Sequence, residues 1–112
     1  MEKDNSFFVD LYFEGKNLKN HDYFSKSDPF VKFLMQTDLD SNMKEIGRTE
    51  AIHNTVNPVW KKKLNVEYVF SIKQPVVIEV YDEDGENKFD FMGKAETTLG
   101  KIMGTQKKSK EF

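Results

Sequence analysis

The sequence of 112 residues contains no cysteine, so it offers neither disulfides nor thiolate ligands for a metal. No apolar stretch approaches the roughly 18 residues that a membrane-spanning helix needs. The opening residues, M-E-K-D-N-S, lack the apolar run of a secretory signal, and no Asn-x-Ser/Thr sequon occurs. Together these absences favour a cytoplasmic protein and exclude the disulfide-rich and thiolate-metal classes.

What the chain does contain is a series of short segments in which apolar and polar residues alternate, the pattern of half-buried strands. We expect strands at residues 7–13, 31–36, 46–52, 64–70, 75–80, 91–99 and 107–112. Residues 99–103 allow at most one helical turn. Regular strands separated by turns predict one domain, residues 1–112 with its core in 7–112. The predicted fold is all-β, an antiparallel Greek-key β-sandwich.

Acidic side chains gather on two loops between these strands. Five aspartates lie there: Asp22, Asp28, Asp82, Asp84 and Asp90. Asp82 and Asp84 are separated by one residue, so in an extended segment both side chains point the same way. Crowded carboxylates repel one another, and Ca²⁺, liganded by several oxygens at about 2.3–2.6 Å, relieves that repulsion. The alternative is that aspartate simply favours loops.

The net charge of −2 conceals an uneven distribution. The two loops hold seven acidic and two basic side chains, a net charge of −5, which leaves +3 for the rest of the chain. An acidic tip on a mildly basic body does not suit nucleic acid. It does suit an anionic membrane once cations fill the tip.

Three segments resemble the C2 domain, a family of calcium-dependent membrane-binding modules. They read D-Y-F-S-K-S-D-P-F-V-K-F, N-P-V-W and V-Y-D-E-D-G-E-N-K-F-D-F-M-G, and the resemblance covers residues 7–112. Within the family the chain is most similar to copines, through K-S-D-P-F, I-G-R-T-E-A-I, N-P-V-W-K and T-T-L-G-K-I. The resemblance implies an eight-stranded sandwich. We count seven strands, so we expect the last one to follow Phe112.

The resemblance also implies a ligand set for two or three Ca²⁺ ions. The family's five calcium-binding aspartates match Asp22, Asp28, Asp82, Asp84 and Asp90, and Asn87 falls where some members use a serine side chain. Family members of this type dock on anionic phospholipid such as phosphatidylserine. The lipid then supplies oxygens that the protein does not, which couples the calcium and lipid affinities.

Membrane contact is expected from the residues around these ligands. Tyr23 and Phe24 follow the first aspartate, and aromatic rings settle at the membrane interface; the alternative is that Phe24 packs under its loop. Lys26 and Lys88 would add attraction to anionic lipid. The tip of the second loop, residues 86–88, is polar where many relatives carry an apolar residue. This departure predicts shallow and mainly electrostatic docking.

A second surface suggested by the family is a basic strand face that binds phosphoinositide. Lys32 and Arg48 fall on strands that contribute to it, but Leu34 and Phe89 stand where polar partners are expected. The alternative is an ordinary solvated strand face.

The sequence therefore predicts a calcium-dependent phospholipid-binding module that moves from cytoplasm to membrane, with target proteins as further possible partners. No nucleophile stands in a recognisable elbow with a base and an orienting group, so we expect no enzyme. A calcium-independent protein–protein interaction domain remains the alternative. A carboxylate hydrolase is the other rival, but it needs an acid in a deep apolar cleft, for which the sequence gives no sign.

Overall fold

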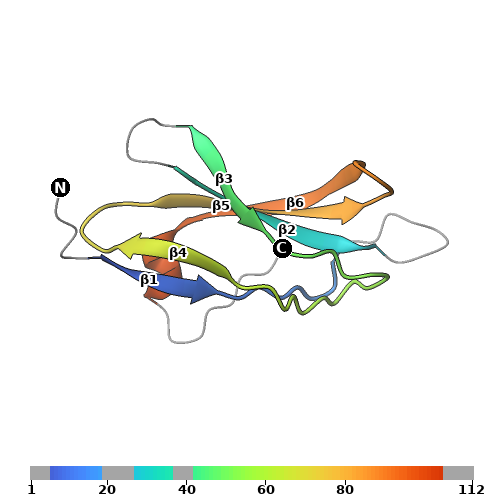
Figure 1. The fold of residues 1–112 in the computed structure, drawn as a ribbon, viewed down its shortest axis with the longest axis horizontal. Helices are drawn as coiled ribbons and strands as arrows, with labels where there is room; N and C mark the ends of the chain where they lie inside the picture. The colour runs from blue at the N-terminus through green and yellow to red at the C-terminus, as the bar shows by residue number, and fades with distance from the viewer. Residues whose placement is uncertain (1–5, 19–26, 37–41, 105–112) are drawn as a thin grey trace.

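Six strands and one short helix make up most of the part of the chain that the structure describes. The computed structural model describes residues 6–18, 27–36 and 42–104. In chain order the elements are β1 (Ser6–Leu11), β2 (Pro29–Gln36), β3 (Met43–Arg48), β4 (Leu64–Val69), β5 (Pro75–Glu83), β6 (Phe89–Thr98) and α1 (Leu99–Met103). Figure 1 shows them as two layers, with β1 and β4 facing the other four strands.

Both sheets are antiparallel. The larger one has the order β3-β2-β5-β6, and the smaller one consists of β1 and β4 among the described residues. The chain therefore crosses between the layers three times among these strands, from β1 to β2, from β3 to β4 and from β4 to β5. These crossings make strands that are distant in sequence neighbours in space, and the predicted antiparallel β-sandwich is confirmed.

The core lies between the sheets and is densest around β2 and β5. Val31 and Phe33 have no exposed surface, and Val76 and Val80 on β5 are each 1% exposed. These residues occupy alternate positions, because successive side chains of a strand point to opposite faces. Trp60, which precedes β4, closes the core from the side, and its indole nitrogen donates a hydrogen bond to the Pro29 carbonyl at 2.9 Å.

The third strand begins and ends earlier than the sequence pattern predicted. We expected residues 46–52, but β3 spans Met43–Arg48. The reason lies at Thr49, whose hydroxyl oxygen accepts a hydrogen bond from the Val31 amide at 2.9 Å. A side chain thus takes the place of a backbone carbonyl, and the regular ladder between the strands stops.

Other strand boundaries differ in ways that matter for the site. Strand β5 continues to Glu83 and β6 already begins at Phe89, so the predicted acidic loop is shortened to residues 84–88. Phe7, at the start of the predicted first strand, is 50% exposed and packs against Tyr68 and Phe70. The single helical turn at Leu99–Met103 is present.

The seventh predicted strand, at 107–112, lies outside the described residues. No helix in the described part of the chain is long and apolar enough to cross a membrane.

Candidate metal centre and the adjoining sheet face

The hairpin between β5 and β6 positions four of the predicted calcium ligands. Asp82 and Asp90 are direct partners in the ladder that joins the two strands. The turn is closed by a hydrogen bond from the Asp84 amide to the Lys88 carbonyl at 2.8 Å. Asn87 adopts a left-handed backbone conformation with φ of 60°, which asparagine tolerates better than most residues. Asp84 and Asn87 are therefore held on a short turn rather than on a long loop.

A second hydrogen bond joins this hairpin to β2. The Asp82 side chain is buried, and its Oδ1 atom accepts a hydrogen bond from the Asp28 amide at 2.8 Å. The Glu83 amide in turn donates to the Asp28 carbonyl at 3.0 Å. Asp28 and Asp82 are 54 residues apart in sequence, and the pairing of β2 with β5 brings them together. The structure thus unites predicted ligands from both loops.

A third segment, for which the sequence pattern predicted no role, contributes to the same end. The Asn54 amide donates to Asp28 Oδ1 at 2.6 Å, and His53 Nδ1 lies 3.3 Å from the same oxygen. The Thr55 amide donates to the Ser27 carbonyl at 2.8 Å. The pair Asn57-Pro58 is a local signal for a turn here, and Asn54 has a left-handed φ of 58°, but the contact with Asp28 depends on long-range packing. The His53 side chain itself is exposed.

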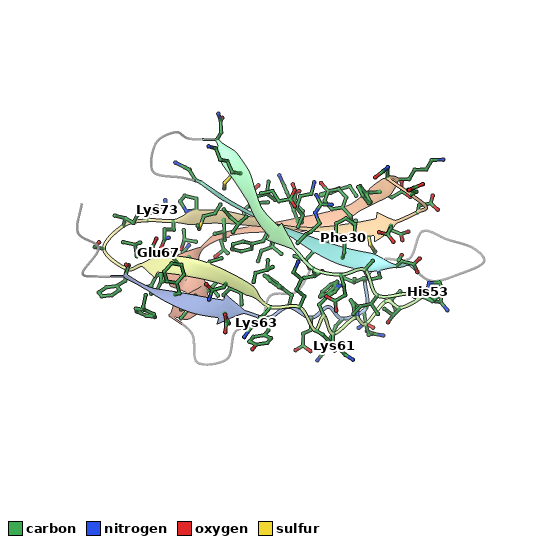
Figure 2. All side chains as sticks on the ribbon, viewed as in Figure 1. Phe30, His53, Lys61, Lys63, Glu67 and Lys73 are labelled. Carbon is green, nitrogen blue, oxygen red and sulfur yellow. The ribbon has the colours of Figure 1, made fainter. Side chains whose placement is uncertain are left out.

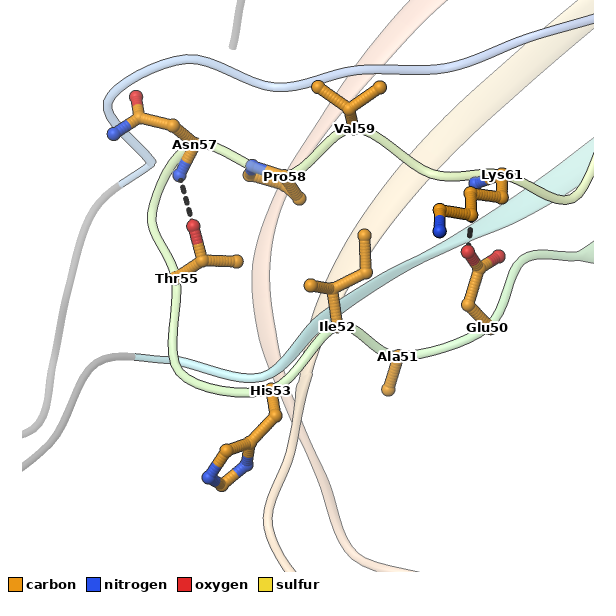
Figure 3. Close-up of a pocket in the computed structure, with 9 residues that line it drawn as sticks. All are labelled: Glu50, Ala51, Ile52, His53, Thr55, Asn57, Pro58, Val59 and Lys61. Atoms are coloured by element: carbon orange, nitrogen blue, oxygen red, sulfur yellow. Dashed lines mark hydrogen bonds between the residues drawn. The ribbon is translucent and has the colours of Figure 1, made fainter.

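Figure 3 shows the surface hollow beside this turn. Among the residues that line it, the Thr55 hydroxyl accepts a hydrogen bond from the Asn57 amide at 3.0 Å. The Glu50 carboxylate, also in the lining, accepts from the amides of Lys61 and Lys62 at 2.8 and 3.2 Å. Burial raises the pKa of Glu50, but these backbone donors outweigh burial and leave the pKa below its usual value. Glu50 therefore stays ionised. Its role is structural, because it holds the segment after β3 against the segment before β4.

The end of the sandwich that carries Asp28, Asp82, Asp84 and Asp90 is called the acidic end. Its side chains offer oxygen ligands, which suit a hard cation such as Ca²⁺. Four of the predicted aspartates are described, namely Asp28, Asp82, Asp84 and Asp90. Within the described residues, no group of three or more acidic, histidine or cysteine side chains converges closely enough to hold a metal ion. The fifth predicted aspartate, Asp22, lies outside the described residues, as do Tyr23, Phe24 and Lys26.

The two residues predicted for a phosphoinositide face lie beside each other. Lys32 and Arg48 are direct partners in the ladder between β2 and β3. Arg48 forms a two-pronged contact with Glu45, with nitrogen–oxygen distances of 2.7 and 2.9 Å. This hydrogen bonding lowers the pKa of Glu45 and raises that of Arg48. The Lys32 ammonium lies 4.8 Å from the ring centre of Tyr81. Contacts within the chain thus hold both cationic side chains in position on this sheet.

Comparison with known proteins points to one family. The family model for the C2 domain matches residues 11–112. The chain is 41% identical over 100 residues to Copine-E of Dictyostelium discoideum. That match covers 85% of this chain but 17% of the relative, so the chain spans about a sixth of the relative's length.

Solved structures share the fold. Human GIVD cytosolic phospholipase A2 matches with a TM-score of 0.72 and 21% identity, over 91% of this chain and 13% of the enzyme. The BON1-C2B structure matches with a TM-score of 0.67 and 26% identity, over 91% of this chain and 70% of its own. A C2 domain of plant extended synaptotagmin 1 has a TM-score of 0.67 at 22% identity, with 88% and 72% covered. From its sequence, its sheet order and these matches, the chain belongs to the C2 domain family.

Proposed function

We propose that this domain binds Ca²⁺ at its acidic end and through it attaches to anionic phospholipid. The observation that carries the proposal is the hydrogen bond of 2.8 Å from the Asp28 amide to the Asp82 carboxylate, which joins two segments 54 residues apart in sequence. Asp90 stands opposite Asp82 in the same ladder. Asp82 and Asp90 lie on paired strands and Asp28 lies just before β2, so all three bring carboxylate oxygens, which a hard cation prefers, to one end of the sandwich.

The full ligand set would comprise Asp22, Asp28, Asp82, Asp84, Asp90 and Asn87, holding two or three ions. Aspartate and amide side chains supply oxygens, the ligands that Ca²⁺ prefers. The fixed backbone around Asp28 reduces the ordering that binding requires, because the Asn54 and Glu83 amides are already hydrogen-bonded to it. Calcium supplies the positive charge that turns an acidic end into a lipid-binding one.

Charge explains why lipid would follow calcium. The two loops carry −5 without metal, and an anionic leaflet repels them. Two Ca²⁺ ions bring the end to about −1 and a third to about +1, after which lipid oxygens can complete the coordination. Lys26 and Lys88 then add attraction of about 1 kcal/mol each, and Tyr23 and Phe24 add apolar contact.

The preferred partner is a phosphatidylserine-like lipid, and the domain would pass from the cytoplasm to the membrane when calcium rises. We assign this domain no catalytic role, because its sequence has no nucleophile in a recognisable elbow with a base and an orienting group. The match covers about a sixth of the copine relative, so the proposal concerns this domain alone. Target proteins are a further class of partner that the family resemblance suggests.

Co-sedimentation with vesicles tests the proposal. We expect binding to vesicles containing phosphatidylserine in calcium, and none in chelator or to neutral vesicles. The Asp82→Asn variant should lose this binding, whereas Asp10→Asn, which changes an aspartate on β1 paired with Lys63, should retain it. Equal binding in calcium and in chelator would contradict the mechanism and favour a calcium-independent interaction domain.

A further inference from the structure

Strand β6 forms an open edge of the larger sheet. In the order β3-β2-β5-β6 it pairs with β5, and no other strand of the described chain lies along its second side. With ten residues, Phe89–Thr98, it is the longest of the described strands, and it contains no proline. An edge strand presents backbone N–H and C=O groups with which another strand can pair. The side chains of β6 decide which strand that is.

The hydrogen-bond pattern shows which backbone groups face this edge. The Leu99 amide donates to the Gln74 carbonyl at 2.9 Å, so these two residues form a hydrogen-bonded pair that continues the ladder between β6 and β5. Hydrogen-bonded and non-hydrogen-bonded pairs alternate along an antiparallel ladder. The register then places Lys94, Glu96 and Thr98 at positions that are not hydrogen-bonded to β5. Their amides and carbonyls therefore point outward.

The part of β6 that carries these groups is regular. Residues 93–98 each have one partner on β5, and the irregularity between Val80 and Tyr81 lies nearer the acidic end. At the opposite edge of the sheet, β3 has six residues, and a register shift interrupts its ladder with β2. Bulges twist an edge away from pairing with another molecule. Of the two edges, β6 therefore accepts a further strand more readily.

Two oppositely charged side chains lie on this regular segment. Lys94 and Glu96 are two residues apart, so they share one face of the strand. Their side chains are 51% and 65% exposed, and Lys94 Nζ lies 3.0 Å from Glu96 Oε2. When a second β6 strand runs antiparallel with Ala95 opposite Ala95, each lysine stands opposite the glutamate of the other copy. The segment is thus complementary to itself in charge.

Charge also selects this register over its neighbours. A two-fold axis at Glu96 would set two glutamates opposite each other, and an axis at Lys94 would set two lysines opposite each other. Like charges directly opposite destabilise a strand pair. With the axis at Ala95, both lysine–glutamate pairs lie at outward-facing positions, so each pair exchanges backbone hydrogen bonds in both directions. The small alanine side chain lets the strands meet closely at the axis.

We propose that the domain forms a symmetric dimer with a second copy of this chain, through antiparallel pairing of residues 93–98 about an axis at Ala95. The same patch then serves on both copies, as a two-fold interface requires. The two four-stranded sheets become one continuous sheet across the dimer. Two short strands make a small interface, so the dimer is weak and forms as the protein concentration rises.

The dimer contact lies away from the acidic end. In Figure 2, Lys73, which precedes β5, and His53, beside Asp28, lie at opposite ends of the molecule. Residues 93–98 pair with the half of β5 that follows Lys73. The predicted calcium ligands therefore remain open in the dimer, and calcium binding and dimer formation should be independent.

Cross-linking tests the register, because the chain has no cysteine of its own. Directly opposite residues of a non-hydrogen-bonded pair have Cα atoms about 4.5 Å apart, within the range that a disulfide spans. Ala95→Cys should therefore form a disulfide with its copy under mild oxidation. The control is Phe8→Cys, on β1 of the other sheet, where the residue is 66% exposed. It should cross-link about tenfold more slowly, because collision alone brings its copies together. Equal rates at the two positions would overturn the register.

Charge exchange provides the second test. Lys94→Glu and Glu96→Lys each set like charges opposite each other, so each variant alone should dimerise about tenfold more weakly than the parent. An equimolar mixture of the two should form a mixed dimer, and Lys94→Glu/Glu96→Lys should dimerise as the parent does. Sedimentation velocity measures this from about 10 µM to 1 mM. Urea unfolding checks each variant, because Glu79 is the ladder partner of Lys94.

The outcomes separate the dimer from the proposed function. A parent protein that stays monomeric up to about 1 mM would overturn the inference. Single variants that dimerise as the parent does would also overturn it, since the association would then use another surface. Calcium titration of the same proteins should give equal affinities. If the parent dimerises as described but binds no calcium, the proposed function fails and the dimer stands.

Discussion

Strands β2 and β5 run through two regions that differ in what holds them together. In the middle of the sheet Val31, Phe33 and Ile78 are buried and pack between the layers. At the end of the same strands the buried group is a carboxylate, Asp82, which accepts a hydrogen bond from the Asp28 amide. Apolar burial in the middle thus fixes the carboxylates at the end. Stability and ion binding should therefore respond to different substitutions.

The largest expected effect is on stability, from the middle of the sheet. Phe33 has no exposed surface, so Phe33→Ala should lower the free energy of unfolding by about 3–5 kcal/mol through lost burial and a cavity. The exposed Phe8 provides a matched control, and Phe8→Ala should change stability by no more than about 0.5 kcal/mol. Urea unfolding measures both. Similar losses in the two variants would mean that the core has been placed wrongly.

The next effect belongs to the acidic end. Calcium at a hundredfold excess over its dissociation constant should add about 2.7 kcal/mol to stability, because it binds only the folded state. Magnesium should add much less, since it requires tighter octahedral coordination. The variant Asp82→Asn/Asp84→Asn should lose the gain. Thermal melting tests this, and an equal rise in melting temperature for parent and variant would place the calcium elsewhere.

Substitution of Thr49 tests whether stability can be lowered without a change in calcium affinity. Its hydroxyl accepts from the buried Val31 amide, so Thr49→Val should cost about 1–3 kcal/mol by leaving that amide without a partner. Calcium affinity should not change, because neither Thr49 nor Val31 belongs to the predicted ligand set. Thr49→Ser keeps the hydroxyl and should retain most of the stability. If Thr49→Ser is as unstable as Thr49→Val, the hydrogen bond is not the cause.

The smallest effect concerns pH. The pKa of Glu45 is lowered in the folded state by Arg48, so this pair adds stability above the unfolded pKa of 4.5 and loses it as pH falls through the lower folded value. The pair is partly exposed, so its contribution is about 0–1 kcal/mol. Between about pH 6 and pH 3, Arg48→Gln should therefore lose less stability than the parent protein. Denaturant midpoints across this range measure the difference, and a larger loss in the variant would contradict the assignment.

Local sequence patterns predicted most of the strands because alternation is a local signal. They could not predict that the Asp28 backbone amide donates a hydrogen bond to the Asp82 carboxylate, because that contact depends on the pairing of β2 with β5. The end of β3 was missed because a threonine side chain replaces a backbone acceptor there. The exposure of Phe89 and Phe91 also depends on register, which alternation alone does not fix.

Residue-level calcium titration by NMR tests the central claim most directly. The backbone amides of Asp28, Glu83 and Asp84 donate hydrogen bonds at the acidic end, so their signals should shift and saturate as calcium is added. Signals from Val9 and Val66, in the ladder of the smaller sheet, should stay in place. Magnesium should produce much smaller shifts. If calcium up to several millimolar, about the range of weak sites, moves no signal at the acidic end, the metal assignment is wrong.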